Sequence, residues 1–150
     1  MPRVRAFGLI AAAFCIFTSG CEDKNGLRSL TGPTPTLEPT FSTIRAQIFE
    51  SGDSSGRPSC VSCHTSQGRT PPAGLDLVNA PYEALVNRAS VERPGVQRVV
   101  PGDPDNSYLI HKLDGRAGIV GQRMPLRGPF LTDGQVQIVR RWVQLGAQNN

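Results

Sequence analysis

Hydrophobic side chains at helical spacing begin near residue 41 and predict a helix over residues 41–49. Thr40 or Ser42 is suited to cap its start, because a hydroxyl oxygen can accept a hydrogen bond from a free backbone N–H group there. The residues that carry the spacing are Phe41, Ile44 and Ile48. One face of this helix is therefore expected to lie in the core.

A longer helix is predicted close to the C-terminus. Thr132 and Gln135 form a capping-box pattern at its start, and Gly146 is placed to end it. Two neighbouring apolar stripes follow the cap: Val136, Val139 and Val143 on one, and Ile138, Trp142 and Leu145 on the other. Trp142 is expected to be a core residue. Its expected partners in the first helix are Ile48 or Phe49.

Two shorter helices are predicted between these. Asn79 with Pro81 starts one that runs to about residue 89, with an apolar side formed by Tyr82, Leu85 and Val86. The other covers residues 106–113, and its candidate caps are Asp103 and Asp105. No segment alternates as a strand of useful length, so the predicted fold class is all-α.

Composition refines this picture. The chain has 16 Gly and 13 Pro in 150 residues, which favours short helices joined by long loops over a coiled coil or a long bundle. Its formal net charge is +4, and residues 1–20 contain Arg3 and Arg5 but no acidic residue. The remaining +2 is too small and too scattered for a nucleic-acid-binding protein.

Residues 1–20 are typical of a secretory signal peptide. A basic stretch with Arg3 and Arg5 precedes an apolar run over residues 6–17, and Thr18, Ser19 and Gly20 follow. The apolar run is shorter than the roughly 20 residues that a membrane-spanning helix needs. The segment is therefore expected to direct export and to be removed.

Cys21 follows this segment directly and resembles the lipidated cysteine of bacterial lipoproteins. That resemblance implies a lipid anchor on Cys21, and Glu22 after it favours the outer membrane. Thr18 stands where an aliphatic residue is usual, so an ordinary signal peptide with a nearby free Cys is the alternative. Residues 21–40, with Pro33, Pro35 and Pro39, read as a flexible tether to a domain over residues 41–150.

One motif carries the chemistry. Cys60-Val61-Ser62-Cys63-His64 is C-x-x-C-H, the attachment signature of haem c. Two Cys three residues apart on a helical turn can reach the two vinyl groups on one haem edge, and the adjacent His can bind the iron. Attachment takes place outside the cytoplasm, so the motif and the export signal support each other. One covalent haem c is the predicted cofactor.

Other uses of this motif fit less well. A dithiol redox site is expected within a βαβ pattern, which the Gly-, Ser- and Pro-rich surroundings lack. A zinc site needs a second pair of ligands, and only His111 remains. A disulfide between residues three apart constrains little.

The second axial ligand has few candidates. Met124 is the only Met besides the initiator and lies in a loop flanked by Gly121 and Pro125. A thioether on such a loop can reach the face of the ring opposite His64, although a gap-filling core Met would look the same. His111 is the rival ligand, and an open or water-bound position is the third possibility.

These features in this order resemble the monohaem cytochrome c fold, and more closely a bacterial family of small exported cytochrome c-like domains. The resembling stretches are Ile48-Phe49, residues 60–64, 73–77 and 101–107, Arg123-Met124-Pro125 and residues 138–147. The resemblance covers about residues 41–148. It implies short helices and long loops wrapped around one haem, with Cys60, Cys63, His64 and Met124 as its protein ligands.

The expected function is therefore single-electron transfer by a membrane-tethered protein on the periplasmic face of a membrane, without catalysis of its own. Its partner is expected to be an unidentified redox protein. The alternatives are a haem-based sensor, or an accessory haem subunit of an exported oxidoreductase. Arginines flanking the motifs are candidates for neutralising the haem propionates or docking an acidic partner, or they are simply solvated. They are Arg57, Arg69, Arg116, Arg123 and Arg127.

Overall fold

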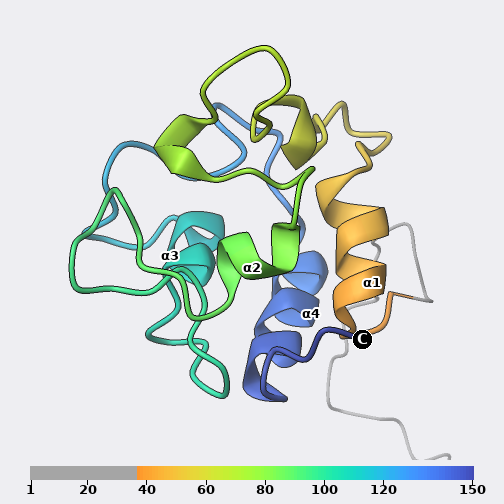
Figure 1. Ribbon diagram of the computed structural model, residues 1–150. Coiled ribbons are helices and arrows are strands. Elements are labelled where there is room, and N and C mark those ends of the chain that lie inside the picture. Colours follow the sequence, from red (N-terminus) through yellow and green to blue (C-terminus); the bar gives the residue numbers. More distant parts are fainter. Residues whose placement is uncertain (1–36) are drawn as a thin grey trace, which may run out of the picture.

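The computed structural model describes residues 37–150 (Figure 1). The predicted signal peptide, the Cys21 anchor and most of the predicted tether lie outside these residues. The described part is 34% helical and 5% strand, so helices and long loops build it. Its strand content consists of isolated bridges such as Val86 with Val99. Within residues 37–150 no helix has the length and apolar character needed to cross a bilayer.

The first predicted helix is present. α1 covers Phe41–Ile44 and continues as the π-helical turn η1 over Arg45–Phe49. Thr40 caps α1, because its side-chain oxygen accepts from the backbone N–H of Thr43 at 3.3 Å. The buried residues are Phe41, Ile44, Ile48 and Phe49, which confirms the predicted core face and extends it by one residue.

The last predicted helix is also confirmed. α4 covers Asp133–Gln144 and starts with the capping box: Thr132 Oγ1 accepts from the Gln135 backbone N–H at 3.2 Å, and the Gln135 side chain accepts from the Thr132 N–H at 3.0 Å. Gly146, with a φ of 97°, follows its end. Leu145, the last residue of the second predicted stripe, lies just past the end of α4 and is 51% exposed.

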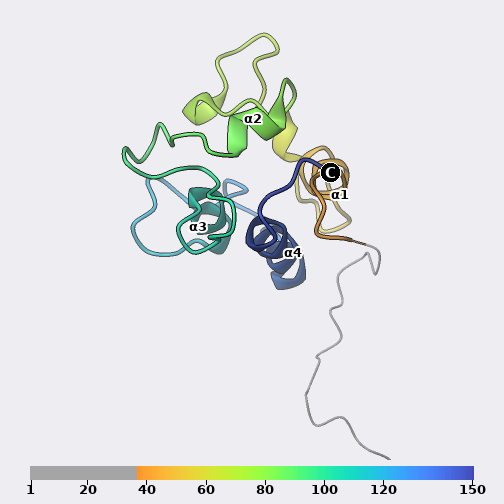
Figure 2. The same ribbon diagram turned by 60° about the horizontal axis from the view of Figure 1, so that its bottom comes forward.

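α1 and α4 lie side by side (Figures 1 and 2). Trp142 is a buried core residue as predicted, and its aromatic neighbour is Phe41, with ring centroids 5.5 Å apart. The indole N–H of Trp142 donates to the Gln148 carbonyl oxygen at 2.9 Å. The C-terminal residue Asn150 returns to the start of α1, where its oxygens accept from the N–H groups of Phe41 and Ser42.

α2 covers only Pro81–Leu85, so the prediction of a helix to residue 89 was wrong. The chain becomes extended at Val86, which forms a parallel bridge with Val99. Asn79 does not cap α2; its side chain instead bonds Ser66 and Asp76. Pairing with a distant segment has replaced the local helical pattern.

α3 covers Tyr108–Asp114 and packs against α4. Neither predicted carboxylate caps it, because the N-cap residue is Ser107 and no side chain bonds its first turn. The Asp103 carboxylate instead accepts from the Asn106 backbone N–H at 3.1 Å, one turn earlier. The Asp105 carboxylate pairs with Arg140 of α4 at 2.7 Å. Both acids therefore organise the loop in front of α3.

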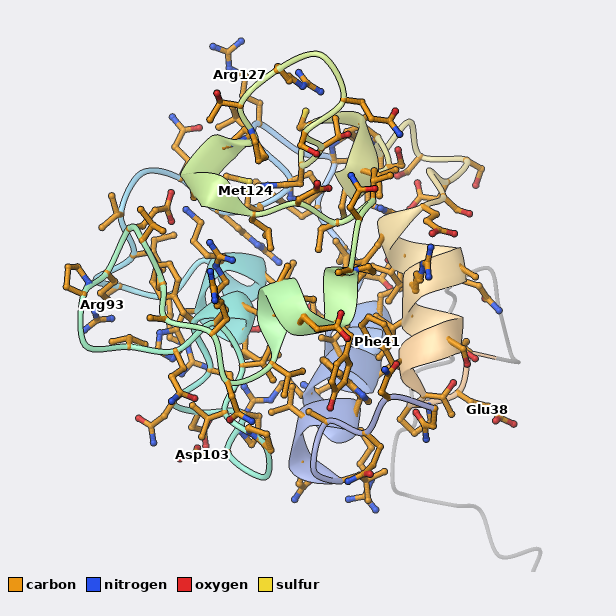
Figure 3. The ribbon with its side chains drawn as sticks, viewed as in Figure 1. Glu38, Phe41, Arg93, Asp103, Met124 and Arg127 are labelled. Carbon is orange, nitrogen blue, oxygen red and sulfur yellow. The ribbon has the colours of Figure 1, made fainter. Side chains whose placement is uncertain are left out.

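Two short 3-10 turns complete the fold. η2 covers Cys60–Ser62 and η3 covers Pro72–Gly74, and both lie at the end of the molecule where η1 finishes (Figure 1). Met124 lies at the same end, and Arg127 points away from the protein beyond it (Figure 3). This end, built from loops, contains the site described next.

Candidate functional site

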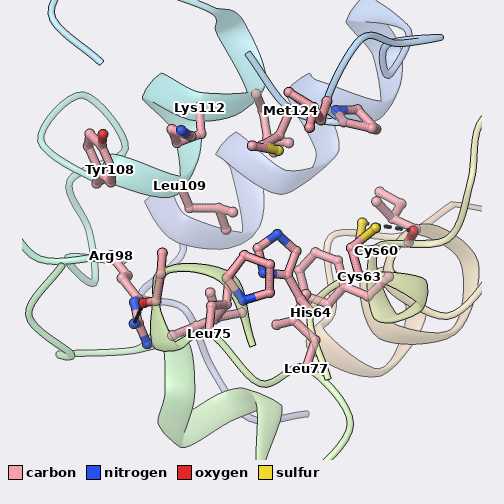
Figure 4. Close-up of a pocket in the computed structure, with 18 of the residues that line it drawn as sticks. Cys60, Cys63, His64, Leu75, Leu77, Arg98, Tyr108, Leu109, Lys112 and Met124 are labelled. Carbon is pink, nitrogen blue, oxygen red and sulfur yellow. Dashed lines mark hydrogen bonds between the residues drawn. The ribbon is translucent and has the colours of Figure 1, made fainter. Parts of the chain in front are cut away.

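A mainly apolar cavity of about 260 Å³ lies between η2, η3, α3 and the loop that carries Met124. Its volume is just below the roughly 300–1,000 Å³ usual for ligand sites. The structure brings together in its lining the four residues that the sequence predicts as haem ligands: Cys60, Cys63, His64 and Met124. His64 and Met124 lie on opposite walls, and the two cysteines lie at one end (Figure 4).

The C-x-x-C-H segment is a compact turn. The Cys60 carbonyl oxygen accepts from the N–H groups of Cys63 at 3.2 Å and His64 at 2.9 Å, so the chain wraps helically as expected. The His64 carbonyl oxygen accepts from the Leu77 N–H at 2.9 Å, which ties the turn to the apolar wall of the cavity. These backbone bonds place the Cys and His side chains on one side of the turn.

The loop before Cys60 is fastened by Arg57, whose side chain is fully buried. Its Nε donates to the Asp53 carboxylate at 2.8 Å, and its two terminal nitrogens donate to the carbonyl oxygens of Ile48, Pro58 and Ser51 at 3.0–3.2 Å. Arg57 does not line the cavity. The prediction that it is a solvated or partner-docking arginine was wrong, because it holds η1 against the approach to Cys60.

The Cys60 thiol donates to the Ile48 carbonyl oxygen, with the two atoms 3.5 Å apart. Burial raises the pKa of this thiol to about 11, and the charge of Arg57 opposes the increase only in part. Cys63 is exposed, and the two sulfur atoms are not joined. Redox-active dithiols have a lowered pKa, so the environment of Cys60 argues against that use of the motif.

The His64 ring is half-buried, and its Nδ1 atom is buried without a hydrogen-bond partner. Burial lowers the pKa of His64, and the nearby backbone of Leu75 and Pro72 partly opposes this effect. The imidazole is therefore neutral at neutral pH, which is the state that binds a metal ion. A buried polar atom without a partner commonly marks a site for a water molecule or another group.

Met124 is positioned by α3. The backbone N–H of Met124 donates to the Lys112 carbonyl oxygen at 2.8 Å, and Arg123 Nε donates to the Leu113 carbonyl oxygen at 2.7 Å. At the other end of the same loop, Val120 bonds both the Lys112 amine and the Tyr108 hydroxyl. The loop thus follows one side of α3, and this brings Met124 to the wall opposite His64.

His111, the rival ligand, does not line the cavity. It is buried on α3, and its Nε2 lies 2.6 Å from the Asp105 carbonyl oxygen. Its position among the polar contacts in front of α3 separates it from the C-x-x-C-H turn. Of the two candidates for the second axial position, the structure brings only Met124 together with His64.

The cavity also has a polar end, which was not predicted from the sequence. Arg98, Tyr108 and Lys112 lie at the end away from the cysteines, and Glu92 lies beside Lys112 (Figure 4). Lys112 follows Tyr108 by four residues and Leu109 by three, so helical spacing places it on the apolar face of α3. That spacing could have indicated from the sequence that Lys112 is buried. No sequence pattern indicates the burial of Arg98, because it depends on contacts with distant segments.

The lining fits the covalent haem predicted from the motif. It offers two thiols at one end, a neutral imidazole with an orphaned nitrogen on one wall and a thioether on the other. Imidazole with thioether is a known axial pair for haem iron. No family model, curated protein or solved structure matches the chain.

Proposed function

We propose that this chain is an exported c-type cytochrome that transfers single electrons between redox partner proteins and is tethered to a membrane through Cys21. The observation that carries the proposal is the convergence of Cys60, Cys63, His64 and Met124 on one mainly apolar cavity. Cys60 and Met124 are 64 positions apart in the sequence, so their meeting is a property of the fold.

Each residue has a distinct role in this proposal. Cys60 and Cys63 would hold one haem c through thioether bonds, and His64 and Met124 would bind its iron from opposite faces. The bound group supplies one-electron chemistry between FeII and FeIII, and thioether ligation raises its potential. The apolar side chains around the ligands exclude water, and the bonds between the Met124 loop and α3 hold the thioether in place.

Electron transfer is favoured over sensing because the chain supplies candidate ligands for both faces of the iron. A sensor or a haem enzyme needs an open or easily vacated position. Cys63 is exposed, so the haem edge attached to it would lie close to the protein surface, where a partner can exchange electrons with it. The predicted tether over residues 21–40 would let the domain reach a donor and an acceptor in turn.

The test is expression of the full chain with haem-maturation machinery. The denatured protein should stay red on a gel with close to one haem per chain. Cys60→Ala together with Cys63→Ala should abolish the colour, whereas the control His111→Ala, at a His outside the cavity, should keep it. Colourless wild-type protein with two alkylatable thiols would refute the proposal.

A second measurement separates a carrier from a sensor. Reduced wild-type protein should resist carbon monoxide at neutral pH and exchange electrons rapidly with small redox mediators. Met124→Ala should leave one coordination position of the iron without a protein ligand and so allow carbon monoxide to bind. Rapid, stoichiometric binding to the wild-type protein would instead favour a gas sensor or a haem enzyme.

A further inference from the structure

The polar end of the cavity is built from buried side chains that carry more positive than negative charge. Arg98 is 7% exposed and Lys112 is 8% exposed, and Tyr108 is also buried. Glu92 is the acidic residue at this end, and its carboxylate lies 3.2 Å from the Lys112 amine. Lys112 is therefore paired, whereas Arg98 forms no ion pair within residues 37–150; the more distant charge of Glu92 compensates it only in part, and Arg88 adds further positive charge nearby.

Arg98 is held rigidly. Its two terminal nitrogens donate to the carbonyl oxygens of Ala84 and Ala73, each at 2.7 Å. These carbonyls are neutral, so they fix the guanidinium without cancelling its charge. They also use only some of its five N–H donors. Burial lowers the pKa of Arg98, which is the mark of a cation that lacks hydration. An anion in the cavity would supply what this environment lacks.

Lys112 and Tyr108 also keep donors free. The Lys112 amine donates to the Val120 carbonyl oxygen at 2.8 Å and pairs with Glu92, which leaves one of its N–H groups. The Tyr108 hydroxyl oxygen accepts from the Val120 N–H at 2.9 Å, so its proton remains available to donate. The two side chains lie on one face of α3 and extend the donor surface started by Arg98.

We propose that Arg98, Lys112 and Tyr108 form the binding site for the two propionate carboxylates of the haem. This inference rests on the proposed function. Cys60 and Cys63 secure the opposite edge of the ring, so the two ends of the cavity differ in chemistry as the two edges of a haem do. The arrangement fixes the orientation of the cofactor, with its thioether edge near the surface and its carboxylates at the buried cations.

None of the five arginines expected from the sequence to have this role lines the cavity, and Arg57, Arg116 and Arg123 are engaged in other contacts. Arg57 is buried outside the cavity, and Arg116 pairs with Asp114 at 2.7 Å. Arg123 bonds the Leu113 carbonyl oxygen, and its guanidinium lies over the Phe130 ring, 4.4 Å from the centroid. None of these three lines the cavity. The structure thus assigns the role to cations that the sequence did not single out.

The test labels the two carboxylates alone. Cells fed 5-aminolevulinate carrying 13C at C1 incorporate the label into the haem at its propionate carboxyl carbons. In the haem-loaded full chain, Arg98→Gln and Lys112→Gln should each move the labelled 13C signals and raise their pH midpoint by roughly 1–3 units. Arg141→Gln makes the same charge change on an exposed part of α4 and should leave both unchanged.

The outcomes are separable. If wild-type protein carries haem but the labelled signals respond no more to Arg98→Gln and Lys112→Gln than to Arg141→Gln, the propionate site is refuted and the proposed function stands. If wild-type protein carries no haem, both the propionate site and the proposed function are refuted. Arg98→Gln also removes two backbone bonds. If that variant fails to load haem, Lys112→Gln and Tyr108→Phe decide, and Tyr108→Phe should move one labelled signal.

Discussion

Replacing Arg57 by Met tests whether a buried ion pair holds the approach to Cys60. The Arg57 side chain is completely buried, and that of Asp53 is 13% exposed. The Arg57→Met side chain fills much of the same volume, but it leaves the Asp53 carboxylate without its cation. It also leaves the carbonyl oxygens of Ile48, Ser51 and Pro58 without their donor.

The expected cost follows from this geometry. Removing one partner of a buried ion pair costs about 3–5 kcal/mol, because the other charge stays behind. Asp53 keeps some contact with water and a hydrogen bond from Ser55, so we expect a value near the lower end, about 3 kcal/mol. For a domain of this size that corresponds to a fall in Tm of roughly 10–15 °C.

The chain offers a matched control. Arg45 pairs with Glu50 at 2.6 Å, but the two side chains are 45% and 41% exposed. Arg45→Met should therefore change the free energy of unfolding by less than about 1 kcal/mol. Urea unfolding followed by circular dichroism gives both values. Equal losses for Arg57→Met and Arg45→Met would refute the view that burial gives the Arg57 pair its importance.

The pH dependence of stability provides a second readout. The pKa of Asp53 falls from 3.8 to about 2, chiefly through the Ser55 side-chain hydrogen bond and then through Arg57, with burial opposing. A lowered pKa in the folded state contributes stability that is complete above about pH 4 and is lost as the pH falls through about 2. In Arg57→Met this loss between pH 4 and 2 should shrink, since part of the pKa shift is gone.

Three further predictions concern the cofactor and the anchor. Met124→Ala should abolish the weak far-red sulfur–iron absorption of the oxidised protein and lower its potential, whereas His111→Ala should keep both; the reverse pattern would indicate two His ligands. In potentiometry Glu92→Gln should raise the potential and Arg98→Gln should lower it, because removing a negative charge destabilises FeIII and removing a positive charge stabilises it; shifts of the same sign would contradict this. Cys21→Ser should move the protein from the membrane pellet to the soluble fraction, and a wild-type protein that is already soluble would argue for an ordinary signal peptide.

The parts of the fold that the sequence predicted correctly are locally determined. The capping box of Thr132 and Gln135 involves neighbours in the chain, so its pattern is readable without tertiary information. The Thr40 cap of α1 is of the same kind. The length of α2 was overestimated because Val86 pairs with Val99. No local pattern shows that a distant partner will end a helix.

The residues of the site also differ in whether a local sequence pattern identifies them. Cys60, Cys63 and His64 form a contiguous motif, and Met124 was found because the chain has only one internal Met. The buried cations had no comparable signature. Arg57 was expected to neutralise a propionate, to dock a partner or to be solvated, although it is fully buried. Arg98 was not singled out, because its contacts come from distant segments. Burial of a charged side chain is a tertiary property, and composition does not reveal it.

α3 connects the two halves of the proposed site, and this determines how variants at its polar end should be interpreted. Lys112 holds the Met124 loop twice: its backbone carbonyl oxygen accepts from the Met124 N–H, and its amine donates to Val120. Lys112→Gln removes the second bond and leaves the first. The far-red sulfur–iron absorption should therefore survive in Lys112→Gln even as the propionate signals move. If both change together, the effect has passed through the Met124 loop. Arg98→Gln then becomes the cleaner measure of carboxylate binding, because Arg98 bonds the carbonyl oxygens of Ala84 and Ala73 and not that loop, whereas Tyr108→Phe also removes a bond to Val120.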